Sequence, residues 1–249
     1  MGERAIVTGA AQGIGEAVAR RLASEGVSLV LTDRQDSVTE LAGELGGIAV
    51  VGAVDDPEIA QRCVVEAVKS HGRVDILINN AGEVAATGPR DGSTNPAADF
   101  DRMIGSNLKG HFLFGRAVAD FMIEAGGGHI VNVSTDHVKP APESVRHHGH
   151  GRMDLYNAAK WAINGLTFDW SNALAKHGIR VNSLCMGATD TAMLRTWMPE
   201  PSPEVLATWM QPEQIADVVV ELLAEGPDGR TGDTIALWAG HDCVLPPPE

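Results

Sequence analysis

Short runs of apolar residues alternate with segments of helical periodicity along almost the whole chain of 249 residues. The apolar runs predict β-strands at residues 5–7, 27–32, 48–51, 74–78, 129–133, 179–184 and 231–237. Between them apolar residues recur every three or four positions, which predicts helices. This alternation indicates one doubly wound α/β domain over residues 1–249, with a mostly parallel seven-stranded sheet and helices on both faces.

Signals at the ends of the predicted helices support this alternation. Asp56 and Pro57 are a typical start for a helix that runs to residue 71, and Pro212 opens another that runs to about residue 224. A long helical pattern that contains Asn107 ends at the glycines of residues 126–128. We therefore expect Asn107 within a helix and not in a loop.

A glycine-rich loop joins the first predicted strand to the first predicted helix. Residues 8–15 contain Gly9, Gly13 and Gly15 in the spacing Gly-x-x-x-Gly-x-Gly. Glycines allow a sharp turn and a close approach of the backbone to a pyrophosphate, whose charge is met by N–H groups at the helix N-terminus. Strand, glycine loop and helix in this order predict a dinucleotide site.

The second predicted strand ends at Asp33, whose carboxylate can accept hydrogen bonds from the adenosine ribose hydroxyl groups. The same charge would repel the 2′-phosphate of NADP, so Asp33 predicts NAD as the cofactor. Arg34 follows directly and can pair with a phosphate, but behind Asp33 we expect it to cover the adenine edge. The alternative is that Asp33 simply opens a turn.

Polar residues follow two further strands of the predicted sheet. The sequence Asn-Asn-Ala-Gly at residues 79–82 comes directly after strand 74–78, and Ser134 and Thr135 follow strand 129–133. In an open parallel sheet, ligands bind in a crevice at the carboxyl ends of the strands. We therefore expect both groups of residues at one site.

The only tyrosine, Tyr156, precedes Lys160 by four residues in a helical pattern. This spacing puts the phenol and the ammonium group on one face of a helix. A nearby cation favours the phenolate, so we expect the pKa of Tyr156 to fall into the range that is useful for acid–base catalysis. A buried tyrosine beside a surface lysine is the alternative, and it stays open for this spacing taken alone.

Charge and composition narrow the classes of partner. The chain has 19 basic and 33 acidic residues and a net charge of −14, which disfavours nucleic acid, an anionic membrane surface and an acidic carrier protein. No stretch approaches the length of a membrane span, and no signal segment precedes residues 5–7. Three widely spaced cysteines without metal-ligand spacing are typical of a reducing compartment. We expect a cytoplasmic protein that acts on a small molecule.

Together these motifs resemble the short-chain dehydrogenase/reductase family over essentially the whole chain. Residues 8–15 resemble its cofactor loop, residues 79–82 its Asn-Asn-Ala-Gly turn, and Tyr156 with Lys160 its catalytic pair. The resemblance implies a Rossmann-type, NAD-dependent oxidoreductase that interconverts a secondary alcohol and its ketone by hydride transfer. It also implies a homotetramer, or a homodimer, that packs through long helices around residues 107–122 and 156–176.

The resemblance assigns roles residue by residue. It implies a catalytic tetrad of Asn107, Thr135, Tyr156 and Lys160, in which Tyr156 exchanges the substrate proton and Asn107 orders a water molecule. Cofactor contacts are implied for Gly9, Gln12, Gly13, Ile14, Gly15, Asp33, Arg34, Val54, Asn80, Ala81, Gly82, Tyr156, Lys160, Gly187, Thr189 and Thr191.

Some positions depart from the family pattern. Counted from the end of the fifth strand, the catalytic serine position holds Thr135, whose hydroxyl can make the same hydrogen bond. A register slip by one residue would give the role to Ser134. Ala53 stands where many relatives have an aspartate that touches adenine, so we expect adenine contact from the backbone of Val54.

Two segments are expected to shape the substrate side. Residues 137–155 are an inserted loop, longer than is common in the family, that contains His147, His148 and His150. No acid or cysteine completes metal-ligand spacing there, so we expect no metal site. Residues 192–210 are expected to form a substrate lid, whose large apolar side chains indicate a hydrophobic or aromatic substrate or, alternatively, belong to the core.

Two other functions remain open from the sequence. A dinucleotide-binding regulator could keep the fold and perform no chemistry, but it would have no need of the full set Asn107, Thr135, Tyr156 and Lys160. The other is an NADPH-dependent reductase of a 3-oxoacyl thioester on a carrier protein. The net charge and Asp33 both weigh against it.

Overall fold

The sheet defines the architecture of the computed structural model, which describes residues 2–91, 93–140 and 151–248. Within these ranges seven strands pair in parallel in the order β3-β2-β1-β4-β5-β6-β7. The strands are β1 (Arg4–Thr8), β2 (Ser28–Asp33), β3 (Ile48–Val51), β4 (Ile76–Asn79), β5 (Gly128–Thr135), β6 (Ile179–Met186) and β7 (Thr234–Leu237). The order reverses between β1 and β4, and the predicted doubly wound single domain is confirmed.

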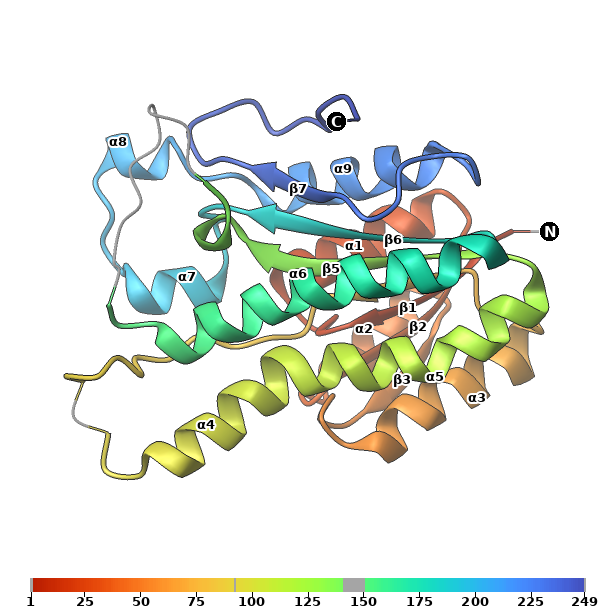
Figure 1. The fold of residues 1–249 in the computed structure, drawn as a ribbon, viewed down its shortest axis with the longest axis horizontal. Helices are drawn as coiled ribbons and strands as arrows, with labels where there is room; N and C mark the ends of the chain where they lie inside the picture. Colours follow the sequence, from red (N-terminus) through yellow and green to blue (C-terminus); the bar gives the residue numbers. More distant parts are fainter. Residues whose placement is uncertain (1, 92, 141–150, 249) are drawn as a thin grey trace.

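Helices cover both faces of this sheet (Figure 1). One face packs against α1 (Gly13–Ser24), α2 (Val38–Leu45) and α9 (Pro212–Ala224). The other packs against α3 (Pro57–His71), α5 (Gly110–Ala125) and α6 (Asp154–Leu174), which the short helix η3 (Ala175–His177) extends. Because β1 to β6 are covered on both sides, they read as continuous apolar runs in the sequence.

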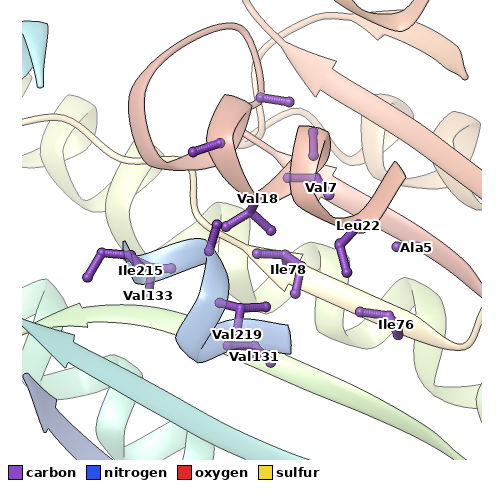
Figure 2. Close-up of a cluster of buried hydrophobic side chains, with 14 of the residues drawn as sticks. Ala5, Val7, Val18, Leu22, Ile76, Ile78, Val131, Val133, Ile215 and Val219 are labelled. Atoms are coloured by element: carbon purple, nitrogen blue, oxygen red, sulfur yellow. The ribbon is translucent and has the colours of Figure 1, made fainter. Parts of the chain in front are cut away.

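Alternate residues along each strand supply two separate cores. In β1, Ala5 and Val7 belong to the core under α1, whereas Ile6 belongs to the core on the other face. Figure 2 shows the first core, where residues of β1, β4 and β5 meet residues of two helices. The labelled side chains are Ala5, Val7, Ile76, Ile78, Val131 and Val133 from the strands, Val18 and Leu22 from α1, and Ile215 and Val219 from α9.

Strand boundaries differ from the prediction near the carboxyl edge. β5 and β6 pair along their whole lengths, from Gly128 opposite Ile179 to Thr135 opposite Met186. The predicted strands stopped two residues too early at this edge. In β5 the reason is that Ser134 and Thr135 are polar and lack the apolar signal, although their backbones are paired. Ser134 and Thr135 are therefore strand residues with fixed orientations.

The helix that carries Asn107 is not one regular helix as predicted. It consists of α4 (Pro96–Ile104), the π-helical segment η1 (Gly105–Lys109) and α5. Gly110 at the end of η1 packs so closely on Val54 that a Cβ would lie 2.7 Å from Val54 Cγ2. Apolar periodicity does not reveal such a local change of winding, which often occurs at functional sites.

Two short helices, α7 (Ala192–Trp197) and α8 (Pro203–Leu206), lie at the carboxyl ends of the strands (Figure 1). Trp209 and Met210 are only 6% and 3% exposed, so this part of the predicted lid belongs to the core. Before α6 the short helix η2 (Asp136–Val138) leads into the inserted loop, whose residues His147, His148 and His150 lie outside the described residues.

No helix within the described ranges is long and apolar enough to cross a membrane. Within the same ranges, histidine, cysteine, aspartate and glutamate side chains form no cluster of three or more that could hold a metal ion.

Candidate active site

The loop before α1 and the first helical turn form a cradle of backbone groups. Gln12 is extended, and Gly13 begins the helix with a φ of 60°. A Cβ on Gly15 would lie 2.1 Å from the carbonyl oxygen of Gly9, so only glycine fits there. The N–H groups of the first turn, including that of Ile14, lack intrahelical acceptors and can bind an anion. Because these positions lack side chains, the cradle has room for the pyrophosphate of a dinucleotide.

Asp33 ties this cradle to the end of β2. Its side chain is buried, and its two oxygen atoms accept the N–H groups of Ala11 and Gln35, each at 3.0 Å. Each carboxylate oxygen keeps a free lone pair, so Asp33 can still accept hydrogen bonds from ribose hydroxyl groups. Arg34 is exposed, and its Nη1 lies 3.8 Å from Oε2 of Glu83, beyond the Asn-Asn-Ala-Gly turn.

Thr8 joins that turn to the glycine loop. Its Oγ1 accepts the N–H groups of Asn80 at 3.0 Å and Ala81 at 3.1 Å. The side-chain amide of Asn80 in turn donates to the carbonyl oxygens of Thr8 and Gly9, each at 3.0 Å. Predicted cofactor residues from the amino-terminal loop and from the end of β4 are thereby brought together.

A third segment reaches the cradle from the end of β6. A Cβ on Gly13 would lie 3.2 Å from Cγ2 of Thr191, which caps α7 by accepting the N–H of Leu194 at 3.3 Å. Thr189 is buried and donates to the carbonyl oxygen of Gly187 at 3.1 Å. Gly187, Thr189 and Thr191, which were expected to contact the cofactor, therefore lie in one turn beside the glycine loop.

Lys160 occupies the centre of the site. It is only 3% exposed, and its Nζ donates to the carbonyl oxygen of Val133 at 2.8 Å. The same Nζ lies 5.6 Å from the ring centroid of Tyr156. A Cβ on Gly82 would lie 3.6 Å from Nζ. Lys160 thus lies between the phenol and the turn after β4, which is the pairing that the four-residue spacing predicts.

Burial sets the direction in which the pKa of the phenol is shifted. It raises the pKa of Tyr156 to about 12, and a hydrogen bond with Thr135 offsets only part of this rise. Burial also lowers the pKa of Lys160 to about 8. The expectation that the pKa of Tyr156 falls is therefore wrong for the chain itself, because loss of hydration disfavours the phenolate.

The two neighbouring hydroxyl groups at the end of β5 have different surroundings. Ser134 is buried and donates to the carbonyl oxygen of Lys160 at 3.2 Å, inside the α6 interface. Thr135 points to the opposite face of the strand, and its hydroxyl lowers the pKa of Tyr156. This arrangement favours Thr135 over Ser134 as the residue that contacts a substrate oxygen.

Asn107 is fully buried, and its side-chain amide is hydrogen-bonded to backbone groups. Its Nδ2 donates to the carbonyl oxygens of Glu83 at 2.9 Å and Met103 at 3.0 Å, and its Oδ1 accepts the N–H of Glu83 at 3.2 Å. A Cβ on Gly82 would lie 2.7 Å from Oδ1. The side chain of Asn107 therefore fixes the chain that leaves the turn after β4.

Sequence reasoning missed three residues that adjoin these groups. Thr8 connects two cofactor loops through hydrogen bonds. The backbone of Glu83 hydrogen-bonds the side chain of Asn107. Asp136 directly follows Thr135 and is buried. Each is the immediate neighbour of a residue that a motif identifies. Their position next to these motif residues was the only sequence signal for them. Sequence position alone does not show in which direction a side chain points.

Comparison with known proteins gives the same picture. The family profile described as short chain dehydrogenase matches residues 3–202. A curated bovine relative, Dehydrogenase/reductase SDR family member 4, is 35% identical over 254 residues, which cover 95% of this chain and 86% of the relative.

Solved structures agree closely with this fold. The 3-ketoacyl-(acyl-carrier-protein) reductase from Brucella melitensis complexed with NADH is 28% identical, with a TM-score of 0.83 and coverage of 96% of this chain and 98% of that one. A chain from Beutenbergia cavernae with bound NADP at low occupancy is 29% identical, with a TM-score of 0.81 and 96% of both chains covered. The protein belongs to the short chain dehydrogenase family.

Proposed function

We propose that the protein is an NAD-dependent alcohol dehydrogenase and ketone reductase that acts reversibly on a secondary alcohol, hydrophobic or aromatic, and its ketone. The observation that carries the proposal is the group formed by the half-buried Tyr156 with the buried Thr135 and Lys160, beside the glycine cradle of α1. A regulator that performed no chemistry would gain nothing from the unfavourable burial of Lys160.

The side chains divide the proton chemistry between them. Tyr156 takes the hydroxyl proton of the alcohol, or returns it to the ketone oxygen, and Thr135 hydrogen-bonds the same oxygen. Lys160 holds the ribose next to the nicotinamide, while Asn107 fixes the chain that leaves the turn after β4. When bound, NAD supplies the hydride acceptor and a positive charge that favours the phenolate.

Asp33 supports NAD rather than NADP as the cofactor. Its carboxylate lies at the end of β2 with both oxygen atoms held by backbone N–H groups, which fixes the negative charge in place. A 2′-phosphate at the adenosine ribose would meet that charge. Similar structures contain NADH in one case and NADP in another, so the carboxylate itself is the basis of this proposal.

Apolar side chains on α7 and beside it support a hydrophobic or aromatic substrate. Met193 and Met198 are 41% and 37% exposed, although each is large and apolar. The guanidinium of Arg152, at the end of the inserted loop, lies 5.8 Å from the ring centroid of Trp197. We propose that residues 192–198 and the inserted loop, residues 137–155, together border the substrate.

A substrate panel tests the proposed function. The purified protein is assayed for NADH formation with secondary alcohols, sugars and hydroxysteroids, and for NADH consumption with the matching ketones. We expect turnover with at least one apolar secondary alcohol and little with charged ones. Absence of NAD-dependent turnover across the panel, in a protein that binds NAD, would favour the regulator over the enzyme.

The similarity to a 3-ketoacyl-(acyl-carrier-protein) reductase favours one second candidate, reduction of a 3-oxoacyl thioester with NADPH. The net charge of −14 opposes the docking of an acidic carrier protein. Including a 3-oxoacyl thioester with NADPH in the same panel separates the two candidate functions. Only the thioester reductase predicts that this substrate and cofactor give the highest turnover.

Assembly as a homotetramer is part of the proposal. Large apolar side chains are exposed on the long helices, with Phe112 on α5 44% exposed and Trp161 and Phe168 on α6 60% and 68% exposed. Such surface is typical of an interface between subunits. Sedimentation should give a tetramer or a dimer, and a monomer at micromolar concentration would contradict this assembly. A cytoplasmic location stays part of the same proposal.

A further inference from the structure

Two neighbouring residues at the end of β2 favour opposite cofactors. The carboxylate of Asp33 suits the ribose hydroxyl groups of NAD, whereas an arginine beside the adenosine ribose suits the 2′-phosphate of NADP. Arg34 directly follows Asp33, and its side chain is 69% exposed. Asp33 alone therefore does not determine the choice of cofactor, because a free guanidinium one residue away would attract the phosphate that Asp33 repels.

The guanidinium of Arg34 is paired with a second carboxylate. Its Nη1 lies 3.8 Å from Oε2 of Glu83, which follows the Asn-Asn-Ala-Gly turn at the end of β4. In the sheet, β2 and β4 lie on either side of β1, which leads into the glycine cradle. The ion pair therefore connects the two strands that flank β1, at the edge of the sheet where the cofactor residues gather.

Glu83 is held in place more firmly than Arg34. Its side chain is only 14% exposed. Its Oε2 also accepts Nη1 of Arg102 on α4 at 3.2 Å, and its Oε1 lies 3.1 Å from the hydroxyl oxygen of Ser106 in η1. Its backbone N–H and carbonyl groups both hydrogen-bond the side-chain amide of Asn107, at 3.2 Å and 2.9 Å. Glu83 is therefore a fixed carboxylate to which the exposed guanidinium of Arg34 is drawn.

We propose that Glu83 determines the choice of cofactor together with Asp33: its carboxylate pairs with Arg34 and so competes with a 2′-phosphate for the guanidinium. This inference deepens the proposed function and rests on its choice of NAD. Glu83 is a positioning residue, because it acts through Arg34 and needs no contact with the cofactor. Its negative charge works in the same direction, since it adds to the repulsion of a 2′-phosphate by Asp33.

The exposure of Arg34 sets the size of the expected effect. An ion pair with an exposed partner is weakened by water and screened by salt, so it changes an affinity by a few-fold and not by orders of magnitude. The difference between variants should therefore be largest at low ionic strength. NAD carries no 2′-phosphate, so its affinity should depend little on whether Arg34 is paired.

Fluorescence titrations with NADP and with NAD at low ionic strength test the inference. Glu83→Gln keeps the size of the side chain and removes its charge. It should tighten NADP binding about fivefold and leave NAD affinity within about twofold of the wild type. Arg34→Ala alone should change NADP affinity by less than about twofold, because the guanidinium is already paired. In the Glu83→Gln background, Arg34→Ala should remove most of the gain in NADP affinity.

A matched control is Asp99→Asn, which removes a carboxylate that contacts Nη2 of Arg102 at 3.5 Å. It should leave NADP affinity within about twofold of the wild type, since Arg34 stays paired with Glu83. An equal gain in Asp99→Asn would indicate a general effect of net charge and would overturn the inference. Arg34→Ala changes only an exposed side chain, so it provides a test even if Glu83→Gln does not fold.

Other results would also overturn the inference: an unchanged NADP affinity in Glu83→Gln, an equal gain for NAD, an equal gain in the Arg34→Ala background, or a loss of about fivefold in Arg34→Ala alone. The titrations need no substrate. Absence of the predicted gain with intact NAD-dependent turnover rejects the role of Glu83 alone, whereas the predicted gain without turnover across the substrate panel rejects the proposed reaction alone.

Discussion

The cofactor side and the catalytic side of the site are built in different ways. On the cofactor side, glycines and backbone N–H groups of one continuous strand–loop–helix unit, residues 4–24, form the cradle. On the catalytic side, buried side chains come from β5, η1 and α6, and the contact between Lys160 and Val133 spans 27 residues. The first region depends on the absence of side chains, and the second depends on their presence and burial.

This difference separates two kinds of damage. Adding an atom to the cradle should block it by steric overlap, whereas removing an atom from the catalytic group should leave the fold and remove chemistry. Substitutions in the cradle should therefore lower stability and cofactor affinity. Substitutions in the catalytic group should lower turnover.

The largest effect is expected from Gly15→Ala. The new Cβ would lie 2.1 Å from the carbonyl oxygen of Gly9 and 2.5 Å from Nδ2 of Asn80, so backbone must move. We expect a loss of stability of about 3 kcal/mol and a fall in NAD affinity of more than about 100-fold, measured by urea unfolding and by fluorescence titration. Gly43→Ala, where nothing lies within 4 Å of the new atom, is the control and should not destabilise. Normal NAD binding by Gly15→Ala would refute the steric account of the cradle.

Removal of one hydroxyl group on the catalytic side comes next. Thr135→Ala should reduce turnover by roughly 10²–10³ with little change in stability, because one donor to the reacting oxygen is lost. Thr135→Ser should keep much of the activity. Steady-state kinetics on the best substrate of the panel provides the measurement. If Ser134→Ala abolished turnover and Thr135→Ala left it unchanged, the catalytic hydroxyl would belong to Ser134 and not to Thr135.

Burial of Lys160 predicts an unusual dependence of stability on pH. Its pKa is about 8 in the folded chain and near the ordinary value of 10.5 when unfolded. Between these values the unfolded chain binds more protons, so this group makes stability rise as pH increases through that window. From about pH 7 to about pH 9.5 the wild type should gain about 2 kcal/mol relative to Lys160→Met.

Urea unfolding of both proteins at the two pH values gives the measurement. Lys176→Met, which removes an exposed lysine, should show no such relative change. A constant difference between the wild type and Lys160→Met would mean that Lys160 is not desolvated in the folded chain.

The smallest effect concerns the choice of cofactor. The wild type should bind NAD at least about tenfold more tightly than NADP, a difference of about 1.4 kcal/mol. Asp33→Ala should narrow this gap mainly by tightening NADP binding, since repulsion of the 2′-phosphate is removed. Titration of both cofactors with both proteins measures it. Equal affinities in the wild type would contradict the role of Asp33.

The comparison also explains what the sequence could predict. The cradle was predictable because Gly9, Gly13 and Gly15 lie within one short segment, and the pair of Tyr156 and Lys160 because four residues make one helical turn. The alternation of strands and helices likewise predicts the sheet, since all strands except the edge strand β7 contribute to the cores on both faces.

Other features depend on contacts between distant segments. The π-helical winding around Asn107 accompanies hydrogen bonds to Glu83, 24 residues earlier, which periodicity does not register. The raised pKa of Tyr156 depends on burial by the surrounding elements, so the spacing to Lys160 alone suggested the wrong direction. Asp136 was passed over because its contact with Thr135 depends on the orientation at the end of β5.

The most direct test of the account is the substitution Tyr156→Phe, which removes one oxygen atom and keeps the aromatic ring. If Tyr156 is the acid–base residue, turnover should fall by at least about 10³, while NAD affinity stays within about twofold of the wild type. Single-turnover measurement of hydride transfer, together with a binding titration on the same protein, gives both numbers. Full activity of Tyr156→Phe would contradict the assignment of this enzyme's chemistry to the phenol.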